Sequence, residues 1–223
     1  MLSLSEVSVN LGGVEVLRRV SLLAPPGVIV GVVGRNGAGK TTLMRSIMGL
    51  LPLAGGRIEL DGARLDLLAP HRRARLGIGY MPEDRRLVPQ WTVKENLMLP
   101  LWAAGETTES SERLQRVFEL VEELYAWRER KALELSGGQQ KIVALGRALV
   151  CARRLLLLDE PFEGVAPALV ARLRELIGKL KRERELAVLV TDSNDAHLSD
   201  LAERLYTIER GALTEALSPV ANC

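Results

Sequence analysis

The most constraining feature of this sequence is the stretch GVIVGVVGRNGAGKTT, in which a short apolar run passes directly into a glycine-rich loop. The loop fits the pattern G-x-x-x-x-G-K-[ST] with Gly34, Gly39, Lys40 and Thr41. The apolar run is typical of a strand buried on both faces, and KTTLMRSIMGL after it predicts a helix that ends near Gly49. A strand, a glycine loop and a helix in this order predict a cradle of backbone N–H groups for a phosphate.

The residue types in the loop indicate a nucleoside triphosphate with magnesium. Lys40 is expected to reach the β- and γ-phosphates, and the Thr41 hydroxyl is expected to bind Mg²⁺. A chance glycine-rich turn is the alternative, and the strand before it and the helix after it argue against that alternative. The loop residues expected to bind ATP are Gly34, Arg35, Asn36, Gly37, Ala38, Gly39, Lys40, Thr41 and Thr42.

A second apolar run, in RRLLLLDEPFEGVAP, ends abruptly in Asp159 and Glu160. Taken alone, the stretch does not distinguish a buried strand whose end meets water from a rigid strand that holds two carboxylates for a reaction, because short apolar runs bounded by charge are common. Beside a phosphate cradle, the first acid is expected to complete the magnesium shell, through water. The second acid is expected to orient and activate the water that attacks the γ-phosphate, which makes Glu160 the predicted catalytic residue.

Composition excludes several other classes of protein. The chain has 223 residues, and 30 Lys+Arg against 28 Asp+Glu leave a net charge of +2, so no concentrated basic surface for a nucleic acid is expected. Its two cysteines, Cys151 and Cys223, predict neither a disulfide framework nor a zinc site. The opening MLSLSEVSVN does not resemble a secretory signal, and no run of about 18 apolar residues predicts a membrane span.

The order of apolar patterns predicts an α/β fold. LSLSEVSV alternates like an edge strand and VEVLRRVSLLA like a second strand, while LLLLDE and LAVLVTD read as buried strands. A helix is predicted from Ser110 to about Trp127, others in QQKIVALGRALV and PALVARLRELIGKLKRER. Strands that alternate with helices indicate a parallel sheet covered on both faces, with a largely helical stretch, residues 83–150, inserted into it.

LELSGGQQKIVALGRALV, which stands just before the acidic strand, carries a family resemblance. Together with the glycine loop and LLLLDEP, its LSGGQ segment resembles the signature of ATP-binding-cassette (ABC) transporter subunits over essentially the whole chain. The resemblance implies one nucleotide-binding domain, residues 1–223, with a P-loop NTPase core of residues 1–82 and 151–223. It also implies an N-terminal antiparallel β subdomain, and a helical subdomain in residues 83–150 that includes the Q-loop.

In that family, two cassettes form a head-to-tail dimer with two ATP molecules between them. Each γ-phosphate then meets the phosphate loop of one subunit and the signature of the other. The signature residues implied to act on the partner's ATP are Ser136, Gly137, Gly138 and Gln139.

Finer features resemble one subgroup, the ATPase subunits of importers for branched-chain amino acids, other amides or urea. They are GYMPEDRRLVPQWTVKENL and EPFEGVAP, with Glu83 in place of the usual Q-loop glutamine and Ala166 in place of an aspartate. The carboxylate of Glu83 is a further candidate ligand of Mg²⁺. The implied partners are a second cassette, transmembrane permease subunits and, indirectly, a periplasmic or extracellular solute-binding protein. The implied location is cytoplasmic, on the inner face of the cell membrane.

Two positions depart from the family pattern. Leu11 stands where an aromatic residue usually stacks on adenine, so the base is expected to rest on aliphatic side chains that include Val16. Asp192 stands at or beside the position of the usual γ-phosphate histidine. We expect its side chain to turn away from the phosphate or to meet it only through Mg²⁺ or water. His197 is interpreted as a surface histidine of a following helix.

Two further functions stay open. EPFEGV and RRARLGIGY also resemble cassettes of lipopolysaccharide-type export systems, and Leu11 and Asp192 suit a weakly active regulatory cassette paired with an active one. In the family, the inserted helical region docks onto the membrane subunits, so Trp91 and Trp102 are either docking residues or core aromatics of that region.

Overall fold

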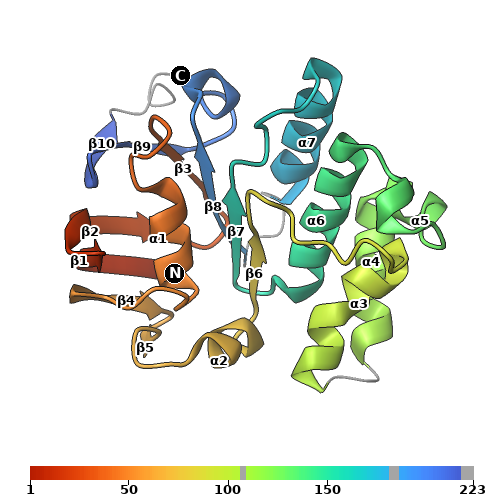
Figure 1. Cartoon of the computed structure of the whole chain (residues 1–223), viewed down its shortest axis with the longest axis horizontal. Helices are drawn as coiled ribbons and strands as arrows, with labels where there is room; N and C mark the ends of the chain where they lie inside the picture. Colours follow the sequence, from red (N-terminus) through yellow and green to blue (C-terminus); the bar gives the residue numbers. More distant parts are fainter. Residues whose placement is uncertain (106–108, 181–185, 217–223) are drawn as a thin grey trace.

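The computed structural model describes residues 1–105, 109–180 and 186–216, which form two sheets and a group of helices (Figure 1). The strands are β1 (Leu2–Leu11), β2 (Val14–Ala24), β3 (Ile29–Val33), β4 (Gly55–Leu60), β5 (Ala63–Arg64), β6 (Ile78–Met81), β7 (Leu155–Asp159), β8 (Ala187–Asp192), β9 (Arg204–Glu209) and β10 (Ala212–Ala216). The helices are α1 (Lys40–Ile47), α2 (Pro70–Arg75), α3 (Val93–Ala104), α4 (Glu109–Leu120), α5 (Glu122–Ala126), α6 (Gly137–Cys151) and α7 (Pro167–Leu180), with 3-10 turns η1 (Ala132–Glu134) and η2 (Asp195–His197).

The larger sheet has the order β10-β9-β3-β8-β7-β6, and its strands run parallel except for β10. Successive side chains of a strand point to opposite faces, and both faces of this sheet are buried. Leu155 and Leu157 of β7 pack in the core formed with α1 and the smaller sheet, whereas Leu156 and Leu158 pack in the core formed with α6 and α7. The predicted parallel sheet with helices on both faces is thereby confirmed.

The smaller sheet is antiparallel, with the order β2-β1-β4-β5. The prediction that LSLSEVSV forms an edge strand is wrong, because β1 pairs with β2 on one side and with β4 on the other. Its alternation reports which face is buried, since Leu2, Leu4, Val7 and Val9 all lie in the core. An alternating pattern carries no information about how many neighbours a strand has.

The helical region, α3 to α6, lies on the right of Figure 1, beside the sheets. The single helix predicted from Ser110 to about Trp127 is wrong, because the chain leaves the helical conformation at Val121 (φ −129°, ψ 81°) and restarts as α5. Val121 is completely buried, so it satisfies the same apolar spacing that a continuous helix would show. The last residues of the helix predicted around α7, residues 181–184, lie outside the described part of the chain.

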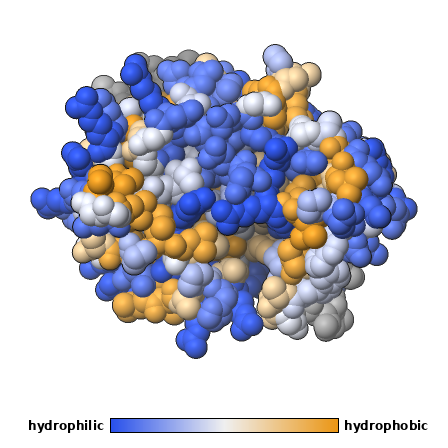
Figure 2. Space-filling model, in the orientation of Figure 1, coloured by the Kyte–Doolittle hydropathy of each residue, from blue (hydrophilic) through white to orange (hydrophobic). Residues whose placement is uncertain are grey.

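Among the described residues, no helix is both long enough and apolar enough to cross a membrane. Hydrophobic residues on the face shown in Figure 2 are exposed in separate groups with hydrophilic residues between them.

Candidate active site

The glycine loop connects the end of β3 to the start of α1, as the sequence predicts. A Cβ atom at Gly34 would lie 2.4 Å from the carbonyl oxygen of Ile208, so any side chain there would collide with β9. Gly39, immediately before Lys40, has φ 117°, a left-handed conformation that L side chains rarely adopt. These two glycines allow the chain to turn from the strand into the helix with its N–H groups inside the turn.

The loop opens onto a cavity of about 260 Å³ beside α1. Its lining residues are Val16, Asn36, Gly37, Gly39, Lys40, Thr41, Thr42, Glu83 and Glu160. Residues far apart in the sequence, Val16, Glu83 and Glu160, therefore meet at the predicted phosphate loop. Leu11 is not among the lining residues and is exposed at the end of β1, paired with Val14, so its contact with adenine stays a prediction.

Lys40 and Glu160 form a buried ion pair at the wall of this cavity. The Lys40 Nζ atom lies 2.9 Å from Glu160 Oε1, and the two side chains are only 3% and 6% exposed. Lys40 also donates to the carbonyl oxygens of Gly34 and Arg35. Glu160 Oε2 is buried and accepts no hydrogen bond from the described residues, so it is available to a water molecule or a ligand.

Asp159 is completely buried at the end of β7, where three hydroxyl groups surround its carboxylate. Oδ1 accepts from Thr41 Oγ1 at 3.3 Å and from Thr191 Oγ1 at 2.9 Å, and Oδ2 accepts from the Tyr80 hydroxyl at 3.4 Å. Burial raises the pKa of the Asp159 carboxyl above its ordinary value. Burial, and then the charge of Asp159, raise the pKa of Tyr80, which keeps that hydroxyl a donor.

Sequence reasoning missed Thr191 and Tyr80. Thr191 had a detectable signal, because it occurs one residue before Asp192 at the end of a predicted strand, and β7 pairs with β8 so that Asp159 stands opposite Thr191. Tyr80 had none, because β6 was not predicted as a strand beside β7.

The oxygens of Thr41 and Asp159 fit a magnesium ion. A hydroxyl and a carboxylate that approach within 3.3 Å of one another at the base of a phosphate loop form a hard oxygen donor set. Thr41 and Asp159 would hold Mg²⁺, which would neutralise phosphate charge during the reaction. Glu83 is exposed at the cavity wall and stays a candidate third ligand.

The LSGGQ segment forms the start of α6, with Ser136 as its N-cap. Ser136 Oγ accepts from the backbone N–H of Gln139, and the Gln139 side chain accepts from the N–H of Ser136 at 2.9 Å. This capping box leaves the N–H groups of Gly137 and Gly138 in the first turn without intrahelical acceptors. The four signature residues do not line the cavity, and Ser136 and Gly137 are exposed.

Asp192 is buried at the end of β8 but does not line the cavity. Its Oδ1 accepts from the N–H of Asn194 at 2.8 Å and lies 3.0 Å from His197 Nδ1. His197 belongs to the short 3-10 helix η2, and its ring packs edge-on against Phe162 with 5.3 Å between centroids. The His197 side chain is 25% exposed, so this histidine lies at the surface while its ring also contacts Asp192 and Phe162.

The fold and the site define a class of protein. A phosphate loop between a parallel strand and a helix, with paired acids at the end of a neighbouring strand, is the arrangement of P-loop nucleoside triphosphatases. The sequence model of one family, described as ABC transporter, matches residues 17–163. The chain belongs to this family of ATP-binding cassettes.

Individual relatives agree with the family assignment. The lipopolysaccharide export system ATP-binding protein LptB of Haemophilus influenzae is 38% identical over 207 residues, which cover 92% of this chain and 85% of LptB. The high-affinity branched-chain amino acid transport ATP-binding protein BraG of Pseudomonas aeruginosa is 36% identical over 96% of this chain and 91% of BraG. The dimeric structure of the bacterial ABC transporter cassette MJ0796 superposes with a TM-score of 0.85 at 25% identity, covering 97% of this chain and 98% of that one. The chain is therefore an ATP-binding and ATP-hydrolysing subunit of an ABC transporter.

Proposed function

We propose that this chain hydrolyses ATP as a head-to-tail dimer and that the dimer powers solute import through separate membrane subunits. The observation that carries the dimer is the position of the signature. Ser136 and Gly137 are exposed at the start of α6 and do not line the cavity of their own chain. A helix start with unpartnered N–H groups suits a phosphate, and the second subunit supplies that phosphate.

Within each site, Lys40 and Glu160 divide the chemistry. Lys40 leaves its ion pair with Glu160 to bind the β- and γ-phosphates, because a phosphate attracts an ammonium group more strongly than one carboxylate does. The freed carboxylate then orients the attacking water and accepts its proton. Its burial excludes bulk water and strengthens both interactions.

Import is the preferred direction because Glu83 and Ala166 match the subgroup of importers for branched-chain amino acids or related amides. Sequence identity does not decide the direction of transport, since LptB at 38% and BraG at 36% match this chain almost equally well. The similarity to LptB makes lipopolysaccharide export the second candidate function. The intact pair of Lys40 and Glu160 argues against a weakly active regulatory cassette.

Glu160→Gln tests the hydrolytic assignment. We expect turnover to fall by at least about 10²-fold, the usual contribution of a positioned general base. ATP should bind more tightly, because the neutral amide no longer competes for Lys40. Gel filtration with Mg-ATP should show a dimer that persists, since hydrolysis opens the closed state. Lys40→Ala is the matched control and should bind no ATP; wild-type turnover by Glu160→Gln would refute the role.

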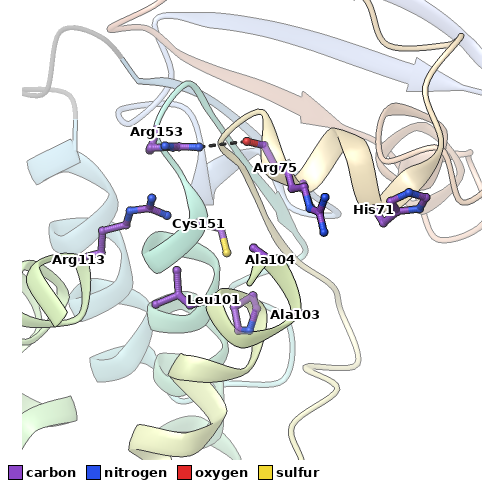
Figure 3. Close-up of a pocket in the computed structure, with 10 residues that line it drawn as sticks. His71, Arg75, Leu101, Ala103, Ala104, Arg113, Cys151 and Arg153 are labelled. Atoms are coloured by element: carbon purple, nitrogen blue, oxygen red, sulfur yellow. Dashed lines mark hydrogen bonds between the residues drawn. The ribbon is translucent and has the colours of Figure 1, made fainter. Parts of the chain in front are cut away.

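A second pocket suggests where the membrane subunits dock. It lies between α2, α3 and the end of α6, and it has a mainly apolar floor with basic groups at its rim (Figure 3). Its described lining residues are His71, Ala74, Arg75, Pro100, Leu101, Ala103, Ala104, Arg113, Cys151 and Arg153. Arg153 donates to the carbonyl of Arg75, which joins two sides of the rim. This combination suits an apolar helix that carries an acidic residue, supplied by a permease subunit on the cytoplasmic side of the membrane.

The direction of transport and the docking surface are tested together in proteoliposomes with the chain's own membrane subunits. A leucine-loaded or amide-loaded binding protein should stimulate ATP hydrolysis; stimulation by lipopolysaccharide alone would establish export instead. Arg75→Glu should reduce the stimulation and leave the ATPase of the isolated chain unchanged. Arg57→Glu, an exposed charge reversal in β4, is the control.

A further inference from the structure

Lys141 is a buried lysine that the sequence analysis did not single out. It lies on the second turn of α6, five residues after Ser136, and is only 6% exposed. Its Nζ donates to two backbone carbonyls, that of Glu160 at 2.9 Å and that of Glu163. The described residues offer Lys141 no carboxylate within ion-pair distance. Burial lowers the pKa of its ammonium group, because removing a charged group from water costs free energy. The hydrogen bonds that offset this cost go to the two backbone carbonyls.

The carbonyls that Lys141 binds belong to a strained turn. Glu160 has φ 49°, a left-handed conformation that is uncommon for a residue with a side chain. Its N–H donates to the Thr191 carbonyl at 3.1 Å, so the peptide groups on both sides of its Cα atom are held. Such strain persists only where surrounding contacts determine the conformation. The strained residue is therefore also the proposed general base, and the buried cation Lys141 binds its carbonyl oxygen.

From this geometry we propose that Lys141 is a positioning residue for Glu160. By binding the Glu160 and Glu163 carbonyls, it holds the backbone in the conformation that directs the Glu160 carboxylate at Lys40 and the cavity. It also joins this turn to the helix that carries Ser136 and Gly137. Because the proposed dimer uses those two signature residues on the partner's ATP, Lys141 links the general base of one site to the signature contact of the other. This inference rests on the proposed function.

The test uses Lys141→Met, which keeps the length of the side chain and removes the donor. We expect the affinity for ATP to stay within about twofold of wild type while kcat falls about 10- to 100-fold, the scale expected for a misplaced reacting group. Lys141→Arg, which can still donate to both carbonyls, should recover part of this loss. Lys94→Met makes the same chemical change at an exposed position of α3 and should hydrolyse ATP normally.

The readout that separates positioning from stability is the trapped dimer. Lys141→Met should persist as a dimer in Mg-ATP, as expected for Glu160→Gln, whereas a merely destabilised chain would lose ATP binding and form no such dimer. If Glu160→Gln forms the dimer and Lys141→Met turns over like wild type, the role of Lys141 is refuted and the proposed function stands. If Glu160→Gln itself hydrolyses ATP, the proposed function fails first. Should Lys141→Met not fold, Lys141→Leu carries the same test with a shorter side chain that also lacks a donor, and a wild-type rate in that variant overturns the inference.

Discussion

The carboxylate of Asp159 has the least access to water of the charged groups in the site, with none of its surface exposed. Its raised pKa means that the folded chain binds a proton at this group more readily than the unfolded chain does. At a pH below the ordinary pKa of an aspartate, Asp159 is protonated in both the folded and the unfolded chain and does not lower the free energy of unfolding. As the pH rises through the raised pKa, the folded state must ionise a buried group and loses stability.

Asp159→Asn should therefore stabilise the fold while it removes magnesium-dependent hydrolysis. The amide can still accept from Thr41 and Thr191, and it can donate to the Tyr80 oxygen. In chelator at neutral pH, a gain of roughly 1 kcal/mol would raise Tm by about 2–4 °C in a chain of this length. Differential scanning calorimetry should show the advantage shrinking toward acid pH. An equal gain in the exposed control Asp200→Asn, or a gain that grows toward acid pH, would contradict this account.

Asp192 should behave as a structural residue. Its side chain holds the turn through the N–H of Asn194 and the ring of His197 rather than facing the cavity. Asp192→Ala should lower the free energy of unfolding by about 1–3 kcal/mol, the cost of unsatisfied buried partners, with less than a tenfold loss of turnover. Asp192→Asn, which keeps an acceptor, is the control. A loss of turnover as large as that of Glu160→Gln, at unchanged ATP affinity, would show a catalytic role.

Residues inside sequence motifs were predictable at this scale, and their partners were not. The glycine loop predicts Lys40, and the acidic end of an apolar strand predicts Asp159 and Glu160. Each motif is local, because phosphate binding requires these residue types next to one another in the chain. The donation from Lys141 to the Glu160 carbonyl joins α6 to the turn after β7. That contact depends on how two elements pack, which no local pattern encodes.

At the scale of elements, the end of α1 depends on Arg73 from α2. This guanidinium is only 5% exposed and donates to the carbonyls of Ser46, Ile47 and Leu68 at 2.8–2.9 Å. The last carbonyls of a helix have no donors within the helix, so Arg73 supplies a donor to Ile47 and joins the Gly49 N–H at Ser46. Gly49, just after the end of α1, has φ 75°, and a Cβ atom there would lie 2.5 Å from Arg73 Cζ, so both the backbone conformation and the packing favour glycine at this position.

Arg73→Ala should unfold at lower urea concentration, with a loss of about 1–3 kcal/mol because buried carbonyls lose their donors. Arg72→Ala removes an exposed arginine from the same helix and should change stability by less than about 0.5 kcal/mol. Equal stability of the two variants in urea titrations would show that water replaces the guanidinium at no cost.

The kinds of elements followed from the sequence, whereas their neighbours and interruptions did not. Periodicity predicted β3, α1, β7 and β8, because a strand buried on both faces and an amphipathic helix differ in spacing. It failed where a feature depends on the surroundings of an element. The interior place of β1 is set by pairing with β4, and the break at Val121 is set by packing in the core.

Two copies of the chain are expected to form one enzyme, and mixing two inactive variants tests this expectation. Lys40→Ala should lack ATP binding, and Ser136→Arg should bind ATP without hydrolysing it, because its signature acts on the partner. In a mixed dimer, ATP on the Ser136→Arg chain meets the intact Ser136 of the Lys40→Ala chain. With random pairing in a two-fold dimer, an equimolar mixture should recover about one quarter of wild-type turnover.

Each variant measured alone provides the baseline for this recovery. Activity of the mixture no greater than the sum of the two separate rates would show that the signature serves its own chain, and a monomeric enzyme would replace the dimer.

The close packing of α6 has a mechanical consequence. The helix has 15 residues and is therefore about 22 Å long. Gly137 lies at one end, and Cys151, which lines the second pocket between α2 and α3, lies at the other. A Cβ atom at Gly79 would lie 2.1 Å from the Ala148 carbonyl oxygen, and one at Gly146 would lie 2.4 Å from Leu124, so neighbouring elements leave α6 little room to bend. A helix held in this way is expected to move as a rigid body. Because a rigid helix moves as one body, a displacement that a nucleotide causes at the signature would reach the surface proposed to face the membrane with little loss.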